Sequence, residues 1–182
     1  MADTTVTGMP TERFGIKEVA NVKFYAYGKN GVVEADPCLY LDTLKVSNIE
    51  FTSEQTEARG GRGNAPLIIW DYGREATVTL QDALLSIETL NLLFAEKVAS
   101  TGPVVISANT FPATYKVVGE TLARNESGVD EIFTWTIEKA KVQSNVTLTM
   151  EAEGDPTVID ITLRVLRGED GKMMTLTKGA TA

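Results

Sequence analysis

The chain has 182 residues, of which 43% are hydrophobic and 23% are charged, and its formal net charge at pH 7 is −8. This composition is ordinary for a soluble globular protein, and the length suits a single domain over residues 1–182. The negative charge disfavours a nucleic-acid grip, which depends on clustered Lys and Arg. The absence of histidine removes the commonest general base and most transition-metal sites, which argues against an enzyme.

Membrane and disulfide chemistry are also disfavoured by the sequence. No apolar run is long enough to cross a bilayer, and residues 1–9 are polar and unlike a secretory leader. We therefore expect no membrane partner, and synthesis in the cytoplasm. The single cysteine, Cys38, excludes an internal disulfide, and without a basic neighbour its thiol is expected to be inert.

The first third of the chain predicts an arm, two strands and a loop. Residues 1–15 show no periodicity and are expected to form an N-terminal arm. Residues 19–27 and 44–54 are strand candidates, and the second changes its apolar parity at Ser47-Asn48, as a β-bulge would cause. Residues 55–65 hold three glycines and two arginines, so we expect a mobile loop.

Two more strands are expected before the helix. Residues 66–70 are nearly all apolar, which is typical of a strand buried on both faces, and Trp70 is expected in the core together with Trp135. Residues 74–80 alternate, with Ala76, Val78 and Leu80 on the side expected to face the core.

One helix is expected, over residues 82–99. Asp82 is a good N-cap, and Thr101-Gly102-Pro103 would end the helix. At about 100° per residue, one apolar stripe is expected to pack inward. It consists of Ala83, Leu84, Ile87, Leu90, Phe94 and Val98. Leu85 and Leu92 lie nearly opposite this stripe, so either a loop of the same chain or a neighbouring subunit covers them.

The C-terminal part has the clearest strand pattern. Short strands are expected at 104–107 and 114–122, alternating strands at 133–138, 146–153 and 159–165, and a last strand at 173–177. In an antiparallel sheet such alternation gives one packed and one wet face. The wet face is either the surface of a monomer or the lining of a channel built by several subunits. The fold class is therefore mainly β: an antiparallel β-sandwich or partly closed barrel with one packed α-helix.

No motif indicates catalysis or a cofactor. The Gly60–Gly63 run lacks the Lys-Ser or Lys-Thr and the following helix of a phosphate loop. Carboxylate pairs such as Glu50 with Glu54, or Glu151 with Glu153, are expected on solvated strand faces and not in a pocket. We expect no catalytic residue, no metal and no cofactor.

The sequence nevertheless resembles a known family. A Gly/Arg-rich loop, a strand pair, the run T-x-T-L-x-D-A-L at 77–84 and a single helix are similar to bacteriophage major tail tube proteins, most strongly over 46–98. The same superfamily includes type VI secretion tubes. The resemblance implies a structural virion protein that stacks as hexameric rings with a β-barrel lumen. DNA would pass through that lumen into the host without specific binding, and the partners would be further copies of the chain and tail proteins such as tape measure, sheath or terminator.

The resemblance also implies roles for particular residues. The assembly loop would comprise Arg59, Gly60, Gly61, Arg62, Gly63 and Asn64, and the lumen would be lined by Thr147, Thr149, Glu151 and Glu153. Leu85 and Leu92 would form a second helix face for subunit contact. Two alternatives remain: the tube subunit of a contractile injection system or bacteriocin, and a monomeric β-sandwich module for adhesion or carbohydrate binding.

Overall fold

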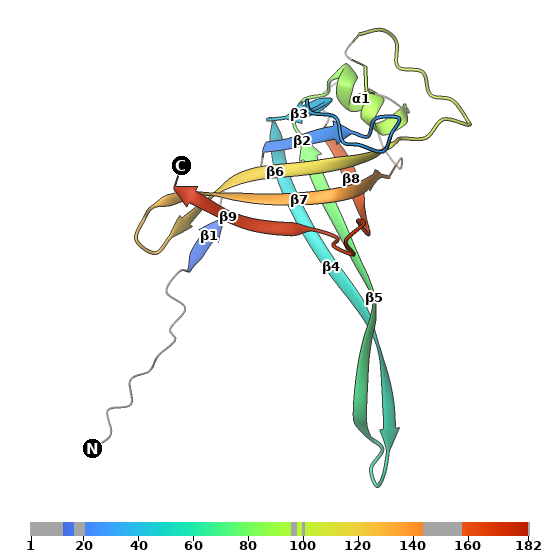
Figure 1. The fold of residues 1–182 in the computed structure, drawn as a ribbon, viewed down its shortest axis with the longest axis vertical. Coiled ribbons are helices and arrows are strands. Elements are labelled where there is room, and N and C mark those ends of the chain that lie inside the picture. Colours follow the sequence, from blue (N-terminus) through green and yellow to red (C-terminus); the bar gives the residue numbers. More distant parts are fainter. Residues whose placement is uncertain (1–12, 17–20, 96–97, 100, 144–157, 182) are drawn as a thin grey trace, which may run out of the picture.

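The computed structural model in Figure 1 describes residues 13–16, 21–95, 98–99, 101–143 and 158–181. Within them lie nine strands and one helix. In chain order these are β1 (Phe14–Ile16), β2 (Asn21–Ala26), β3 (Leu39–Leu41), β4 (Leu44–Gly60), β5 (Ala65–Asp82), α1 (Ile87–Phe94), β6 (Thr114–Asn125), β7 (Asp130–Val142), β8 (Ile159–Leu166) and β9 (Thr175–Thr181).

All nine strands belong to one antiparallel sheet. Its main path runs β3-β2-β6-β7-β8-β5-β4, while β1 pairs with β6 and β9 pairs with β7. The expectation of a mainly β, antiparallel fold is therefore confirmed. The described strands do not close into a barrel, because β3 and β4 end the path and each keeps an outer edge without a partner strand.

The β6–β7 hairpin is the centre of this sheet. The outer edge of β6 pairs with β2 along residues 115–120 and with β1 along 123–125. The outer edge of β7 pairs with β8 along 139–142 and with β9 between 131 and 136. Each outer edge of the hairpin therefore pairs with two strands. β1 and β9 extend the sheet at the end of the hairpin that carries the β6–β7 turn (Figure 1).

The core lies on one face of this sheet and is capped by α1. The alternation expected for residues 74–80 and 159–165 is confirmed, since every second side chain there is buried. Trp135 and Ile137 of β7 are also buried, as expected. Together with residues of β2, β3, β6 and α1 they form one cluster. Burial of this many aliphatic and aromatic side chains is the main stabilising contribution to the fold.

The helix is shorter than expected and starts later. Ser86 is its N-cap, with Oγ accepting from the Thr89 amide at 3.0 Å. Asp82, expected to be the cap, is instead the last residue of β5, where pairing with Leu44 and Ile159 keeps it extended. Its buried carboxylate accepts from the Thr43 hydroxyl at 2.5 Å and from the Leu84 amide at 3.4 Å.

The inward face of the helix is also corrected. Leu92 and Leu93 are fully buried, whereas Leu84, Leu85 and Ile87 are exposed. The reason is that residues 83–86 are not helical, so the stripe counted from Ala83 does not continue around a helix there. Leu90, Phe94 and Val98 do pack partly against the core. The proposed contact of Leu92 with a neighbouring subunit is wrong, because its own chain covers it.

The region expected to contain two strands and a loop is one long hairpin. β4 and β5 pair from Leu44↔Asp82 to Gly60↔Ala65, so the loop expected over 55–65 is reduced to the turn at 61–64. A bulge lies between Leu44 and Val46, and not at Ser47-Asn48. Trp70 is half exposed and not in the core, and residues 66–70 are not buried on both faces.

Other expectations are adjusted at the ends of the chain. Phe14 and Gly15 belong to β1 and not to a free arm, and residues 1–12 of the expected arm lie outside the described residues. The last strand begins at Thr175. The strand expected at 146–153 also lies outside the described residues.

A glycine makes room for the largest core side chain. Gly119 of β6 lies directly opposite Trp135 of β7. A Cβ built on Gly119 would be 2.0 Å from the Cε2 atom of the Trp135 indole. The indole therefore lies across the Gly119 backbone, and any larger residue would compete for its space.

We predict that Gly119→Ala destabilises the protein, because the indole of Trp135 must leave its position or the strands must shift. Overpacking of this kind costs about 1–3 kcal/mol, measured as a lower midpoint in urea unfolding. Gly15→Ala is the matched control, since Gly15 is also in a strand and its added Cβ would meet nothing within 4 Å. Equal midpoints for the two variants would show that the Trp135 packing is not constrained.

Candidate assembly surface

The outer part of the β4–β5 hairpin stands away from the rest of the protein. β8 covers β5 only from Thr77 to Asp82, so earlier residues of β5 pair with β4 alone. We call residues 54–72 the arm; Figure 1 shows it projecting from the body as a two-stranded ribbon. Such a ribbon is marginally stable alone in water, so a partner surface would stabilise it.

The arm has two chemically different faces. Directly opposed residues of an antiparallel pair share a face. One face carries the pairs Ala58↔Ile68, Thr56↔Trp70 and Glu54↔Tyr72. We call this the apolar face of the arm. Ile68, Trp70 and Tyr72 are each about half exposed there, at 52%, 50% and 52%.

The opposite face of the arm is polar and internally paired. Gln55 Nε2 donates to Asp71 Oδ1 at 2.7 Å, and Arg59 Nη2 lies 2.5 Å from Glu57 Oε2. Ile69, opposite Glu57, is an exposed apolar member of this face, and Leu67, at the register shift near the tip, is exposed as well. Since the polar groups of this face already have partners, the apolar face is the better candidate for docking. A row of exposed large apolar side chains is typical of a protein–protein contact.

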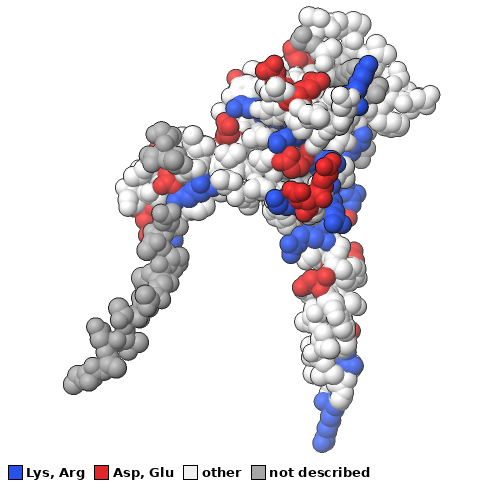
Figure 2. Space-filling model, in the orientation of Figure 1, with Lys and Arg blue, Asp and Glu red and all other residues white. Residues whose placement is uncertain are grey.

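The expected assembly loop forms the end of the arm. Arg59 and Gly60 are the last residues of β4, and Gly61 and Gly63 have φ of 76° and 92°, values that favour glycine. Figure 2 shows Lys and Arg atoms at this tip, on an arm that is otherwise mostly uncharged. The structure therefore brings all six residues together at an exposed end. Their role in assembly stays a prediction.

A second exposed apolar region lies beside the helix. Leu85, expected to contact another subunit, is 46% exposed, and its neighbours Leu84 and Ile87 are exposed as well. The loop before β6 adds Val105, Ile106 and Phe111. In Figure 1 the end of the molecule that carries α1 is opposite the arm. The two exposed apolar regions thus mark opposite ends of the protein.

Sequence reasoning missed the exposure of the arm and of Leu84 and Ile87, whereas it kept Leu85 as a residue for subunit contact. The apolar run at 66–70 was interpreted as a strand buried within its own chain. The same run would equally suit a strand that a second chain buries. The expected lumen residues Thr147, Thr149, Glu151 and Glu153 lie outside the described residues.

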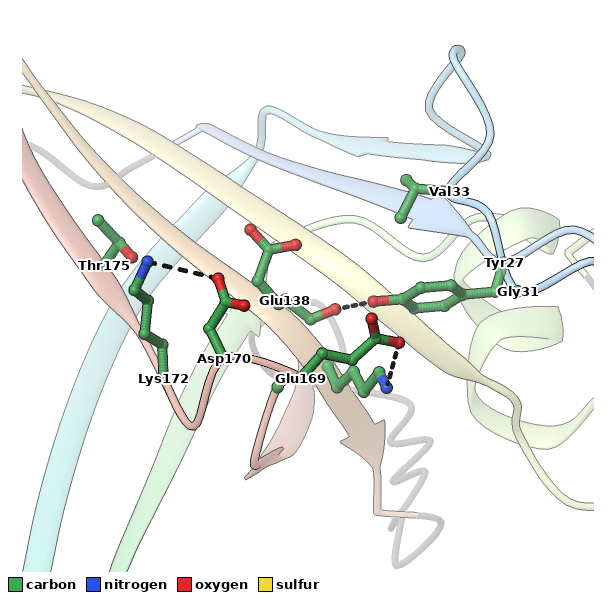
Figure 3. Close-up of a pocket in the computed structure, with 10 residues that line it drawn as sticks. Tyr27, Gly31, Val33, Glu138, Glu169, Asp170, Lys172 and Thr175 are labelled. Carbon is green, nitrogen blue, oxygen red and sulfur yellow. Dashed lines mark hydrogen bonds and ion pairs between the residues drawn. The ribbon is translucent and has the colours of Figure 1, made fainter.

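Clustered charges elsewhere do not form a reactive site. Figure 3 shows a hollow of about 330 Å³ in which the Tyr27 hydroxyl donates to the Glu138 carbonyl oxygen. Each nearby carboxylate has a lysine partner: Glu138 with Lys116, Glu169 with Lys139, and Asp170 with Lys172, at 3.2–3.6 Å. Most of these side chains are well exposed, so the pairs contribute little and leave the carboxylates solvated.

The described residues hold no group of three or more His, Cys, Asp or Glu side chains placed to bind a metal ion. In the same part of the chain, no helix has the length and apolar character needed to cross a membrane.

Comparison with known proteins gives a consistent result. The model of the YomU/Tube protein family matches residues 14–101 and 95–176, which together make up most of the chain. A sequence search of curated proteins found no match. A solved chain of the anti-feeding prophage (AFP) baseplate, 6-fold symmetrised, is similar with 16% identity and a TM-score of 0.54, over 92% of this chain and 97% of that chain. This likeness shows a shared fold.

A chain of the PVC sheath-tube complex, an extracellular contractile injection system in its extended state, is 15% identical. The two chains align over 98% of this chain and 99% of that chain, with a TM-score of 0.49. At that score the likeness carries no structural argument.

The single cysteine, Cys38, belongs to neither exposed region. It is half-buried and donates to the Phe24 carbonyl oxygen at 3.3 Å. Burial raises the pKa of the Cys38 thiol, with a smaller contribution from the charge of Glu34. Since the thiolate is the nucleophile, the folded protein holds this group in its unreactive form.

We predict that at pH 8 a thiol reagent modifies Cys38 more slowly in the folded protein than in the urea-unfolded chain at the same pH. The raised pKa lowers the thiolate fraction, and burial limits access. The folded rate should rise with pH beyond the range in which the unfolded rate has levelled off. Equal rates in the two states would contradict the assignment of Cys38 as inert.

Proposed function

Because the chain belongs to the YomU/Tube protein family, we propose that it is the tube subunit of a contractile, phage-tail-like injection particle. Membership of this family makes it a structural protein and not an enzyme. In the proposed particle, copies of the chain form six-membered rings, and the rings stack into a hollow tube. Sheath, baseplate and terminator proteins would be its partners in an extracellular particle.

The observation that carries this proposal is the arm. A body with a well-packed core projects a two-stranded ribbon whose apolar face has no cover within the described chain. Exposure of Ile68, Trp70 and Tyr72 to water is unfavourable, and burial against another copy would remove that cost. In the proposed ring this face meets a different patch of the next copy, so the contact repeats from copy to copy instead of ending at a dimer.

The open sheet supports ring formation. β3 and β4 each have an outer edge without a partner strand among the described residues. Exposed edges pair readily with other chains, and closure into a ring would remove them. Both the arm and the edges therefore favour a repeating assembly over the monomeric adhesion or carbohydrate-binding module.

The polar face of the sheet is the candidate lining of the channel. On β5 and β8 the residues opposite the core are polar: Thr77, Thr79 and Gln81, with Asp160, Thr162 and Arg164 beside them. The row Thr147, Thr149, Glu151 and Glu153 would extend this lining. A wall of hydroxyl and mixed charged groups stays hydrated, so it would let a polar cargo pass without holding it.

An injection particle is favoured over a bacteriophage tail by the shared fold with a chain of the anti-feeding prophage baseplate. The bacteriophage tail tube is the alternative, in which the same channel would conduct DNA in a virion. The two are separated by isolating particles with a tagged chain from the producing cells. An injection particle would contain a sheath protein and no nuclease-protected DNA, whereas a virion would carry a packaged genome.

The tube itself is tested by negative-stain electron microscopy of the purified chain over a range of concentrations. We expect rings with six-fold symmetry, and stacked tubes at the higher concentrations. A chain that stays monomeric under all of these conditions, with or without its sheath partner, would overturn the proposal.

We predict that Ile68→Lys blocks tube formation and leaves the melting temperature unchanged, because Ile68 lies on the apolar face of the arm and outside the core. Ile69→Lys is the matched control. It places the same charge one residue away on the polar face, opposite Glu57, which can pair with it. Equal tube yields from the two variants, counted in micrographs, would show that the apolar face makes no subunit contact.

A further inference from the structure

A groove lies where the arm leaves the body. It has a volume of about 690 Å³ and is lined by Phe51, Thr52, Ser53, Arg74, Gly171, Lys172, Met173 and Met174. We call it the basal groove. Its volume is within the range of roughly 300–1,000 Å³ in which protein pockets enclose organic groups.

The basal groove combines apolar and basic chemistry. Phe51 is 51% exposed, and Met173 and Met174 pack against the edge of the core. Arg74 and Lys172 are the charged residues of the lining. Figure 2 shows Lys and Arg atoms at the base of the arm, with Asp and Glu atoms beside them. The Lys172 ammonium lies 3.5 Å from Asp170, but both side chains are well exposed, so this pair is readily exchanged. An occupant with apolar side chains and a carboxylate would suit the groove.

The end of the body that carries α1 offers such a segment. We call residues 84–88 the apical segment: Leu84, Leu85 and Ile87 are exposed, and Glu88 stands in the first turn of α1. Glu88 is the only charged residue between Ala83 and Ala95. The apical segment therefore offers three apolar side chains and one negative charge, which complements the basal groove.

We propose that the basal groove of one copy receives the apical segment of a second copy. This inference rests on the proposed function, because it specifies how consecutive rings would contact each other. The apical segment lies at the end of the body that carries α1, and the basal groove lies where the arm leaves the body at its other end (Figure 1), so the contact is head to tail. A head-to-tail contact between two different patches generates an open stack, as a tube requires. Leu85 then contacts another subunit, as the sequence suggested.

A charge exchange tests the polar part of the contact. Lys172→Glu and Glu88→Lys should each raise the protein concentration needed for tube growth several-fold, because each places like charges together. The double variant should restore most of the loss. High salt should reduce the defect of each single variant. Lys29→Glu, an exposed lysine in the turn after β2, is the control and should change little. A double variant no better than its singles would overturn the pairing.

Cross-linking tests the geometry directly. In a Cys38→Ser background, Leu85→Cys with Met173→Cys should give a ladder of disulfide-linked oligomers in tubes under oxidation. Mixing the two single variants should give dimers alone, because each copy then carries one thiol. A disulfide needs Cα atoms within about 7 Å, and the opposite placement of the two sites excludes a bond within one chain.

The outcomes separate this contact from the proposed function. Tubes without cross-links would overturn the basal groove contact and leave the tube function standing. Cross-links from Met173→Cys to a cysteine at Trp70, and none to Leu85→Cys, would assign the groove to the arm of another copy instead. Absence of tubes from the unsubstituted chain would overturn the function, and the contact with it.

Discussion

The point at which β8 stops pairing with β5 determines which part of the β4–β5 hairpin is buried and which part is exposed. Pairing between the two strands ends at Thr77, while the β4–β5 hairpin continues for many more residues. On one side of this point β5 contributes Val78 and Leu80 to the core, and Ala76, directly beyond it, is buried as well. In the arm the same strand has only β4 beside it, and its large apolar residues are exposed. One part of β5 therefore packs in the core of its own chain, and the rest of β5 is exposed where a partner could bind.

The backbone of β4 and β5 is irregular at the point where the arm leaves the body. The register of β4 and β5 shifts between Thr52 and Glu54, and Gly73 takes a φ of 61°. Bulges of this kind increase local twist and re-aim the strands that follow. The irregularity lies beside the basal groove, so the direction of the arm and the shape of the groove depend on the same few residues. An occupant of the groove would therefore help to fix how the arm points.

The rest of the sheet is arranged to keep the body independent of assembly. Each outer edge of the β6–β7 hairpin pairs with two strands. The packing of the hairpin depends on Gly119, because the Trp135 indole occupies the space beside it. At the far end Lys178 pairs with Glu131 at 2.7 Å, and both are largely buried. All of these contacts lie within one chain. The formal charge of −8 favours solubility of the chain, and in the proposed tube the apolar surfaces would provide the contacts between copies.

The sequence alone determined the features that depend on local periodicity. Alternation at 74–80 and 159–165, with Trp135 and Ile137 between, gave the antiparallel mainly β class and much of the core, because a period of two can only bury one face. The family resemblance, the single helix and the Gly/Arg-rich tip of the arm were also readable from the residues. These are properties of short segments, and neighbouring strands did not alter them.

The tertiary structure decided which apolar segments are buried. Residues 66–70 have the composition of a buried strand, yet no described element packs over their side chains. Composition alone does not show whether the same chain or another chain buries such a strand. The helix shows the same limit: pairing of Asp82 in the sheet overrode its capping preference, so Ser86 caps the helix and Leu92 packs inward. Leu85 and Trp70 became exposed through the placement of strands far away in the sequence. Which side chains are buried depends on how the strands are arranged in space, whereas an apolar residue by itself has only a preference for burial.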